Sequence, residues 1–327
     1  MLDIKQSWYK SSFSLSTLML LPFSYLFGAC ASMRRLLYRI KILKSYTFKN
    51  VPIIVVGNIT VGGTGKTPFV IWLADFLNSK GYKPGIVSRG VGGKAHLKPY
   101  VVNSHDQAAT VGDEALLLQQ AGYPVVIGVK RVLAVEKLLA HSDCNVVLSD
   151  DGLQHYRLNR DMEIALIDGM RKLGNKRLLP AGPLRESPRR LKTVDFILVN
   201  DTHEAENNIV LAPTSFVSLK TGQAISIHSF PLQPIHAVAG IGNPARFFNT
   251  LQALGLKTIE HVYRDHYLYQ AKDLHFNDNL PIVMTEKDAV KCKEFADERY
   301  WYLKVDVKVN IKLEEKIIEK LSSWGVR

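Results

Sequence analysis

The stretch VVGNITVGGTGKTPFVIWLADFL, residues 55–77, decides the fold. It overlaps an apolar, β-branched run that ends in Gly-Asn, residues 51–58, and this run predicts a buried strand of a parallel sheet. Residues 67–81 carry apolar side chains at helical spacing and end in glycine, so they predict a helix. A strand, a glycine-rich loop and a helix in this order are the setting of a phosphate-binding loop.

The residue types of this loop suit phosphate binding. Glycines let backbone amides face phosphate oxygens, the helix N-terminus adds a favourable dipole, and a lysine adds positive charge. Thr60 stands where the usual pattern has its first glycine, so a tight turn with an incidental lysine is the alternative. We expect the loop to bind the phosphates of ATP and the Thr67 hydroxyl to bind Mg²⁺; the phosphate-binding residues are Gly62, Gly63, Thr64, Gly65, Lys66 and Thr67.

The composition is that of a globular protein with anionic partners. The 327 residues suffice for two domains, 46% of them are hydrophobic and 22% are charged. The net charge of +12 favours a nucleotide, a nucleic acid or an anionic lipid as partner, although a plain basic surface also fits it. No nucleic-acid-binding motif accompanies the charge. Three cysteines without metal-ligand spacing indicate a reducing compartment.

The N-terminal segment has the pattern of a membrane-associated helix. Residues 11–33 contain no charged residue, and their apolar part, residues 15–31, is near the minimum of roughly 17 residues for a membrane span. Basic residues then alternate with apolar ones: Arg34, Arg35, Arg39, Lys41 and Lys44. We expect a membrane-embedded or interfacial helix, with the basic block on the anionic membrane surface and the rest of the chain in the cytoplasm. A cleaved signal peptide and a buried core helix are the alternatives.

Strand and helix patterns alternate along the remaining chain. They predict an α/β fold with a doubly wound, mostly parallel sheet of the P-loop NTPase type. We expect four segments: a membrane-associated helix and basic segment at residues 1–46, a P-loop core domain at 47–200, extended linker strands at 201–231, and a smaller C-terminal α/β domain at 232–327.

Acidic residues mark two places where ligands of such sheets bind. Asp150 and Asp151 end the strand-like part of NVVLSDDGLQH, residues 145–155, which is where phosphate-loop enzymes hold magnesium. A helix cap beside a surface acid is the alternative. Asp113 and Glu114 begin a predicted helix, and taken alone they are more typical of a capping pair than of a catalytic one.

Two further motifs offer polar side chains from loops. Asp265 and His266 in DHYLY form an acid–histidine pair, and such a pair suits the acceptance of a proton from a substrate hydroxyl. A loop histidine alone is more often structural or solvated. Arg185 and Glu186 end the Pro/Gly-rich run LPAGPLRE, which could shape the mouth of a substrate site.

As a set, these motifs resemble one known family. GNITVGGTGKTP, SRG, VGDEA, DDGLQH, LPAGPLRE, GIGNPARFF, DHYLY and MTEKDAVK occur in this order over nearly the whole chain. The chain resembles the tetraacyldisaccharide 4'-kinases, the lipid A 4'-kinases of Gram-negative bacteria. In that family Gly57 and Asn58 belong to the loop motif GN-x-x-x-GGTGKTP, so the resemblance implies a phosphate loop in spite of Thr60.

The resemblance implies transfer of the ATP γ-phosphate to the 4'-hydroxyl of tetraacyldisaccharide 1-phosphate, which yields lipid IVA. It implies a base dyad of Asp113 and His266, phosphate and magnesium binding by Lys66 and Thr67, and an acidic pair near the metal at Asp150 and Asp151. Glu114 is a further expected metal ligand, and the expected substrate contacts are Asn58, Arg89, His155, Arg185 and Glu186. The sequence departs from the family pattern at SRGVGGK, where SRGYGR is usual, and at Tyr267, where a second histidine is usual.

The resemblance also implies the partners. We expect a membrane lipid substrate, a location at the cytoplasmic face of the bacterial inner membrane, a monomer and no nucleic acid. Because Asp113 and His266 lie in different predicted domains, we expect these domains to close around ATP. Two other classes are weighed against this one: a phosphate-loop NTPase that inserts a metal or acts as a switch, and a membrane-bound nucleic-acid binder. The first should show a Cys/His cluster or an Asn-Lys-x-Asp motif, and the sequence has neither.

Overall fold

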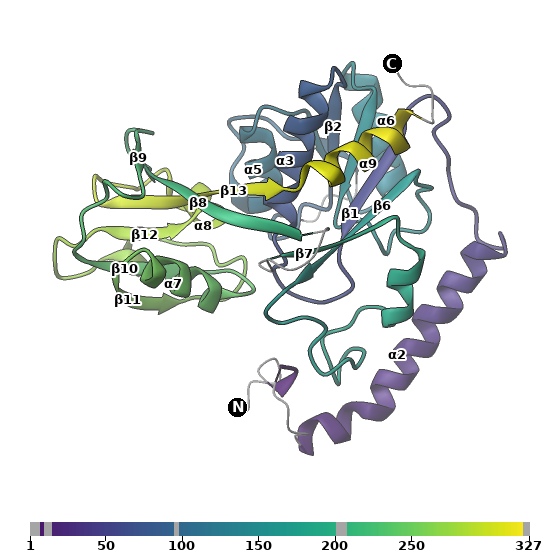
Figure 1. The fold of residues 1–327 in the computed structure, drawn as a ribbon, viewed down its shortest axis with the longest axis horizontal. Coiled ribbons are helices and arrows are strands. Elements are labelled where there is room, and N and C mark those ends of the chain that lie inside the picture. Colours follow the sequence, from purple (N-terminus) through teal and green to yellow (C-terminus); the bar gives the residue numbers. More distant parts are fainter. Residues whose placement is uncertain (1–6, 10–14, 95–97, 201–207, 323–327) are drawn as a thin grey trace.

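The computed structural model describes residues 7–9, 15–94, 98–200 and 208–322. In this part of the chain, thirteen strands form one sheet with the order β11-β10-β12-β13-β8-β7-β6-β1-β5-β2-β4-β3, and β9 pairs with β8 (Figure 1). Pairing is antiparallel for β3 with β4 and for β8 with β9 and β13, and parallel for the other pairs. The predicted mostly parallel α/β sheet is therefore confirmed. Parts of the predicted segments 1–46 and 201–231 lie outside the described residues.

The elements have the following bounds. The strands are β1 Ile53–Gly57, β2 Pro84–Ser88, β3 Tyr100–Val101, β4 Val125–Ile127, β5 Val146–Asp150, β6 Met162–Asp168, β7 Phe196–Asn200, β8 Asn208–Ser218, β9 Ala224–Ser226, β10 Pro234–Ala239, β11 Lys257–Val262, β12 Ile282–Thr285 and β13 Tyr300–Val309. The helices are α2 Leu15–Arg39, α3 Lys66–Ser79, α4 Ala108–Val111, α5 Asp113–Gln120, α6 Arg131–His141, α7 Pro244–Ala253, α8 Glu286–Cys292 and α9 Ile311–Ser322, with 3₁₀ turns at Pro188–Thr193 and Ala271–Leu274.

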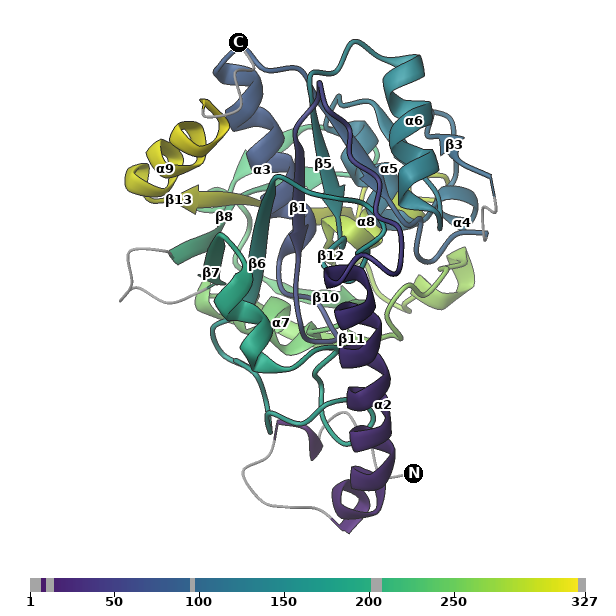
Figure 2. The same cartoon turned by 90° about the vertical axis from the view of Figure 1, so that its right-hand side faces the viewer.

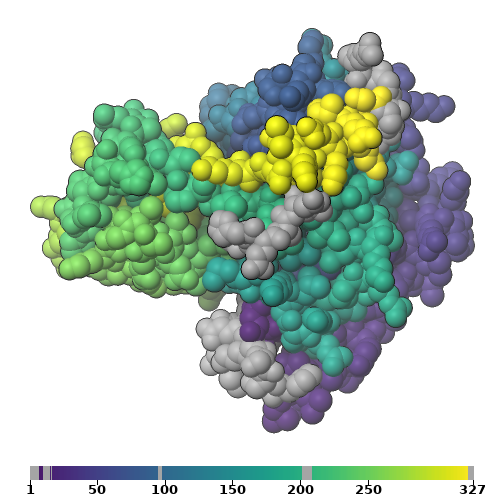
Figure 3. All heavy atoms as spheres, in the orientation of Figure 1, coloured from purple at the N-terminus to yellow at the C-terminus, as the bar shows by residue number. Residues whose placement is uncertain are grey.

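The sheet carries two lobes. The part built on β1–β7, with α3 and α5 packed on one face and α6 on the other, is called the first lobe here. The part built on β10–β12, with α7 on one face and α8 on the other, is called the second lobe. The long strands β8 and β13 pair with each other and join the lobes, and the second lobe projects from the first (Figures 1 and 3).

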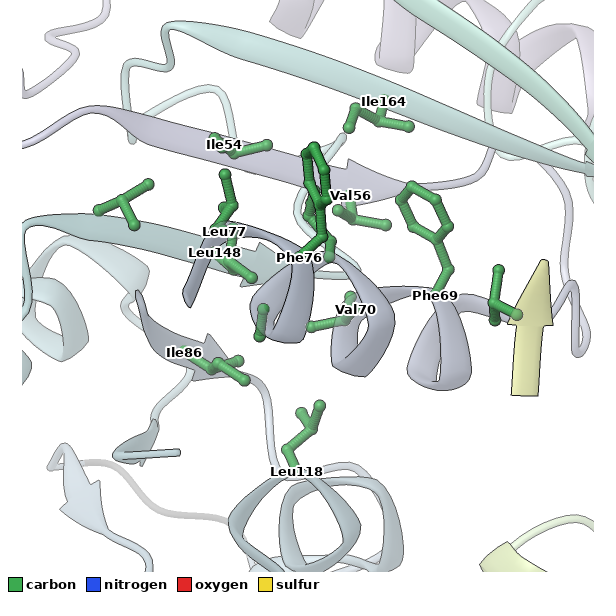
Figure 4. Close-up of a cluster of buried hydrophobic side chains, with 14 of the residues drawn as sticks. Ile54, Val56, Phe69, Val70, Phe76, Leu77, Ile86, Leu118, Leu148 and Ile164 are labelled. Atoms are coloured by element: carbon green, nitrogen blue, oxygen red, sulfur yellow. The ribbon is translucent and has the colours of Figure 1, made fainter. Parts of the chain in front are cut away.

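The core beneath the glycine loop fixes the start of helix α3. Successive side chains of strand β1 point to opposite faces of the sheet. Ile54 and Val56 face α3, whereas Ile53 and Val55 face α6. Phe69, Val70 and Leu77 of α3 are fully buried against this face (Figure 4). Each such side chain contributes about 1.5–3 kcal/mol through burial, and together they hold α3 against β1 along its length.

Helix α9 returns the end of the chain to the first lobe. Its buried residues Leu313, Ile317 and Leu321 recur at a four-residue spacing and belong to the same core as Phe69. Figure 1 shows the helix beside α3, beyond the end of β13. Residues 232–327 thus contribute to both lobes, and the division of the chain into domains stays a prediction.

Helix α2 confirms only that the N-terminal segment is helical, not that it associates with a membrane, and it lies apart from the sheet (Figure 2). Its small residues face the protein: the Ser24 hydroxyl donates to the Leu178 carbonyl at 2.7 Å, and a Cβ on Gly28 would come within 2.6 Å of the Leu178 side chain. Several large apolar residues of α2 are exposed: Leu15, Leu18, Met19, Phe23, Leu26 and Met33. Among the described residues, no helix is long and apolar enough to cross a membrane.

Candidate active site between the two lobes

The glycine loop links β1 to α3. Gly62 and Gly65 have φ values of 106° and 82°, which other residues adopt only with strain. Asn58 is fully buried, and its Nδ2 donates to the Gly62 carbonyl at 3.4 Å and lies 3.3 Å from the Thr64 hydroxyl. Asn58 therefore lies behind the loop and braces it, away from the cavity where a substrate contact was expected. Asn200, at the end of β7, adds a bond to the Thr64 carbonyl that the sequence did not indicate.

Lys66 and Arg185 converge on Asp151. Lys66 Nζ lies 3.7 Å from Asp151 Oδ1, and Arg185 Nη1 lies 2.9 Å from both carboxylate oxygens. Burial acts to raise the pKa of Asp151, but Lys66 and Arg185 outweigh it and hold this pKa well below its usual range. Asp151 is thus an anion that positions two cations at the mouth of the glycine loop.

Asp150 is the more secluded member of the acidic pair. It is 1% exposed, its Oδ2 lies 3.4 Å from the Ser88 hydroxyl, and its Oδ1 has no hydrogen-bond partner among the described residues. Burial and the nearby carboxylates of Glu114 and Asp151 raise the pKa of Asp150, while Lys66 opposes them. A buried carboxylate oxygen without a donor fits a place where a cation binds.

The expected acid–histidine dyad forms across the lobes. His266 Nδ1 lies 2.9 Å from Asp113 Oδ1, although the two residues are 153 positions apart. Asp113 begins α5 in the first lobe, directly after Gly112, whose φ of 89° permits the break between α4 and α5. His266 lies in the loop after β11, in the second lobe, at a φ of 61°.

The contact between Asp113 and His266 shifts the pKa values of the two residues in opposite directions. Burial acts to raise the pKa of Asp113, but His266, Lys287 and Lys291 outweigh it and lower this pKa. Burial acts to lower the pKa of His266, and the hydrogen bond with Asp113 outweighs it and raises this pKa. The pair therefore favours a carboxylate beside an imidazole that readily takes up a proton.

Two lysines of α8 complete this cluster, and the sequence alone did not predict a role for either of them. Lys287 Nζ lies 3.0 Å from Glu114 Oε1 and 3.2 Å from Asp265 Oδ1. Lys291 Nζ lies 3.7 Å from Asp113 Oδ2. Both occur in the motif MTEKDAVK, whose closely spaced lysines were the available signal.

The remaining expected residues belong to the same site. Arg89, His155, Arg185 and Glu186 all line the cavity described below. Burial, with Arg131 and Arg89 nearby, lowers the pKa of His155 to about 4, so its imidazole is neutral near pH 7. Glu186 accepts hydrogen bonds from Gln154 and Tyr156, so part of its role is to hold the neighbouring chain.

One cavity of about 1300 Å³ connects these groups. Its lining includes the glycine loop, Lys66, Glu114 and His266, together with residues of α2: Phe27, Cys30, Ala31 and Arg34. Apolar residues of α3, α7, β8 and β13 also line it: Ile71, Leu211, Pro213, Phe247, Leu303 and Val305. The volume exceeds that of most small-molecule sites, which is about 300–1,000 Å³.

A second set of contacts ties the lobes together beside the glycine loop. Arg246 of α7 donates from Nη2 to Asp168 Oδ2 at 2.9 Å, and Asn243 lies 3.4 Å from the same oxygen. Arg171 of the first lobe donates to the Gly242 carbonyl at 2.7 Å. The loop before α7 is thereby held against the glycine loop.

The fold and the site define the class: a phosphate-loop α/β enzyme whose polar groups come from two lobes around one cavity. The family model of Tetraacyldisaccharide-1-P 4'-kinase (LpxK) matches residues 16–322. The chain belongs to this family of lipid A kinases, as its motifs indicated.

Individual relatives agree with the family model. A tetraacyldisaccharide 4'-kinase of Nitrosococcus oceani is 45% identical over 320 residues, which cover 97% of this chain and 94% of the relative. One of Coxiella burnetii is 46% identical over 329 aligned residues, which cover 100% of this chain and 98% of the relative. The crystal structure of LpxK from Aquifex aeolicus in complex with ATP is similar with a TM-score of 0.78 and 29% identity, over 94% of this chain and 99% of that one.

Proposed function

We propose that this chain transfers the γ-phosphate of ATP to the 4'-hydroxyl of tetraacyldisaccharide 1-phosphate, with the residues named above as its catalytic and binding groups. The observation that carries this proposal is the single cavity, which holds the glycine loop, His266 and the inner side of α2. The ATP complex of the Aquifex aeolicus relative supports ATP as the phosphate donor.

Nucleotide binding rests on the first turn of α3. Gly62, Gly63 and Gly65 present backbone amides, and Lys66 brings a positive charge to the phosphates. When these phosphates bind, Lys66 can exchange its 3.7 Å contact with Asp151 for a phosphate oxygen, since Arg185 still neutralises that carboxylate. The apolar residues around Phe247 can receive the adenine base.

The residues around the loop fit Mg²⁺. The described residues hold no group of three or more His, Cys, Asp or Glu side chains suited to a metal ion. Mg²⁺ in kinases needs only one or two protein ligands besides phosphates and water, and Thr67, Asp150 with its unpartnered Oδ1, and Glu114 can supply them. When bound, the ion would neutralise charge that develops on the phosphates.

The dyad accepts the proton of the substrate hydroxyl. Asp113 is 2% exposed and holds Nδ1 of His266, whereas His266 lines the cavity, so Nε2 is the ring atom that meets the substrate. As the hydroxyl oxygen forms its bond to the γ-phosphorus, its O–H bond breaks and the proton passes to Nε2. The bond from phosphorus to the β,γ-bridging oxygen breaks, and ADP leaves with that electron pair.

The acyl chains of the substrate stay in a bilayer, so α2 has to meet the membrane surface. Its exposed apolar residues suit burial in the interface, and the basic residues after Met33 suit anionic head groups. The double variant Phe23→Ser/Leu26→Ser should bind phosphatidylglycerol vesicles at least about tenfold more weakly, whereas Leu232→Ser, at an equally exposed site in the second lobe, should bind normally. Equal vesicle binding by all three proteins counts against this role of α2.

The reaction is tested with γ-labelled ATP, Mg²⁺ and tetraacyldisaccharide 1-phosphate in detergent, beside Lys66→Ala and Asp113→Ala. Label should enter the lipid, and both variants should lose at least about 100-fold of the rate. ATP hydrolysis without labelled lipid, over several acyl-chain lengths, would instead favour the phosphate-loop NTPase alternative.

A further inference from the structure

Lys291 is a buried cation between two carboxylates that belong to different lobes. Its Nζ lies 2.6 Å from Asp288 Oδ1 on its own helix and 3.7 Å from Asp113 Oδ2 in the first lobe, and the side chains of Lys291 and Asp113 are each 2% exposed. The ring of Tyr269 lies 4.9 Å from the ammonium group. A charge this secluded is maintained only where its surroundings compensate it closely.

Asp288 fixes the position of this lysine. Its Oδ2 accepts bonds from the Gly240 amide at 2.9 Å and from the Thr285 hydroxyl at 2.7 Å, and the residue is fully buried. Thr285 in turn caps helix α8 by accepting from the Asp288 amide. The ammonium group of Lys291 is therefore aimed at Asp113 by a rigid part of the second lobe.

Lys291 does not belong to the lining of the cavity. Among the described residues, Lys287, His266 and Glu114 line the cavity, whereas Lys291 and Asp113 do not. The contact of Lys291 with Asp113, whose carboxylate holds His266, links this lysine to the cavity. The order of contacts is Asp288, Lys291, Asp113 and His266.

We propose that Lys291 is a positioning residue of the phosphate transfer, which holds the Asp113 side chain directed at Nδ1 of His266 so that the substrate proton goes to Nε2. This inference rests on the proposed function of the dyad. It assigns a task to MTEKDAVK, the motif of the second lobe that lies outside the dyad and the glycine loop.

The contacts around Asp113 show what this lysine adds. Of the two lysines of α8, Lys291 approaches Asp113 Oδ2 more closely, at 3.7 Å, whereas Lys287 lies at 4.0 Å and is held by Glu114 at 3.0 Å. Without Lys291, Asp113 loses the nearer of these two cations, so its contact with Nδ1 of His266 should lengthen or be lost.

The test compares kcat and KM for the wild type, Lys291→Met and Lys291→Arg. In Lys291→Met we expect kcat to fall by about 10- to 100-fold and both KM values to stay within about twofold, and Lys291→Arg, which keeps the positive charge, should recover most of this loss. In an Asp113→Asn background Lys291→Met should cause no further loss. Lys293→Met, an exposed site beside the same helix, is the control and should behave as the wild type.

Two outcomes would overturn the proposal: an unchanged kcat in Lys291→Met, or a loss of kcat that persists in full without Asp113. Should Lys291→Met fail to fold, Lys291→Met/Asp288→Asn removes both buried charges and carries the same expectation. Should the wild type transfer no phosphate to the lipid, the proposed function fails, yet the NMR signal of the His266 Nδ1 proton, which reports its hydrogen bond to Asp113, still decides the inference. Loss or a clear shift of this signal in the variant supports it, and an unchanged signal overturns it.

Discussion

The contact between Arg246 and Asp168 allows a quantitative test of how the lobes are held together. The two side chains are 16% and 3% exposed, and the bond joins α7 of the second lobe to the end of β6 in the first. A hydrogen bond between charged groups contributes about 1.5–3 kcal/mol, and breaking a fully buried ion pair costs about 3–5 kcal/mol. In Arg246→Met, Asp168 keeps its bonds from the amides of Met170 and Arg171, so we expect a loss near the lower range, about 2 kcal/mol.

Urea denaturation followed by tryptophan fluorescence measures this loss. The matched control is Arg299→Met, because Arg299 also bonds an aspartate at 2.9 Å, but its side chain and that of Asp297 are 25% and 43% exposed. An exposed pair contributes about 0–1 kcal/mol.

Since the dyad forms only where the lobes meet, Arg246→Met should also lower kcat, by at most about 30-fold for 2 kcal/mol.

A free energy of unfolding for Arg246→Met within about 0.5 kcal/mol of that for Arg299→Met would refute the reasoning. It would mean that burial between the lobes adds nothing to this pair. A loss of stability without any loss of kcat would separate the two parts: the pair would then stabilise the fold without holding the dyad together.

Three further predictions concern the core, the dyad loop and pH. Phe69→Ala should lower the free energy of unfolding by about 3–5 kcal/mol, measured by urea denaturation, because this fully buried side chain fills the core beneath the glycine loop. Gly112→Ala should lower kcat more than about tenfold in the lipid kinase assay, since its Cβ would come within 2.4 Å of the Val91 carbonyl oxygen and displace Asp113. The kcat of the wild type should rise with pH through the pKa of His266, which lies above its ordinary value. Asp113→Asn removes the group that raises this pKa. In this variant the rise of kcat with pH should therefore occur at lower pH, while the highest kcat falls at least about 100-fold.

The sequence allowed the sheet around the glycine loop to be predicted well. The strand at β1 was expected within residues 51–58 and covers Ile53–Gly57, after Pro52, which has no amide hydrogen for the ladder. Asp150 was expected at a strand end and is the last residue of β5. These predictions succeed because apolar runs and turn residues act locally.

Residues whose role depends on the docking of the lobes could not be predicted in this way. Asp113 had the pattern of a helix cap and does bond the Glu114 amide, but its contact with His266 depends on how β8 and β13 place the second lobe. The resemblance supplied that pair, and nothing in local periodicity could. The same holds for Lys291 and for Arg246 with Asp168, whose partners lie in the other lobe.

The second lobe also controls the charge of the base. All three cations near Asp113, namely His266, Lys287 and Lys291, come from that lobe. Their presence lowers the pKa of Asp113 when the lobes are docked, so docking gains stability above the ordinary pKa of an aspartate and loses it as pH falls through the lowered value. In the mechanism proposed above, phosphate transfer needs the docked lobes, because Asp113 and His266 come from different lobes and meet only where these are in contact.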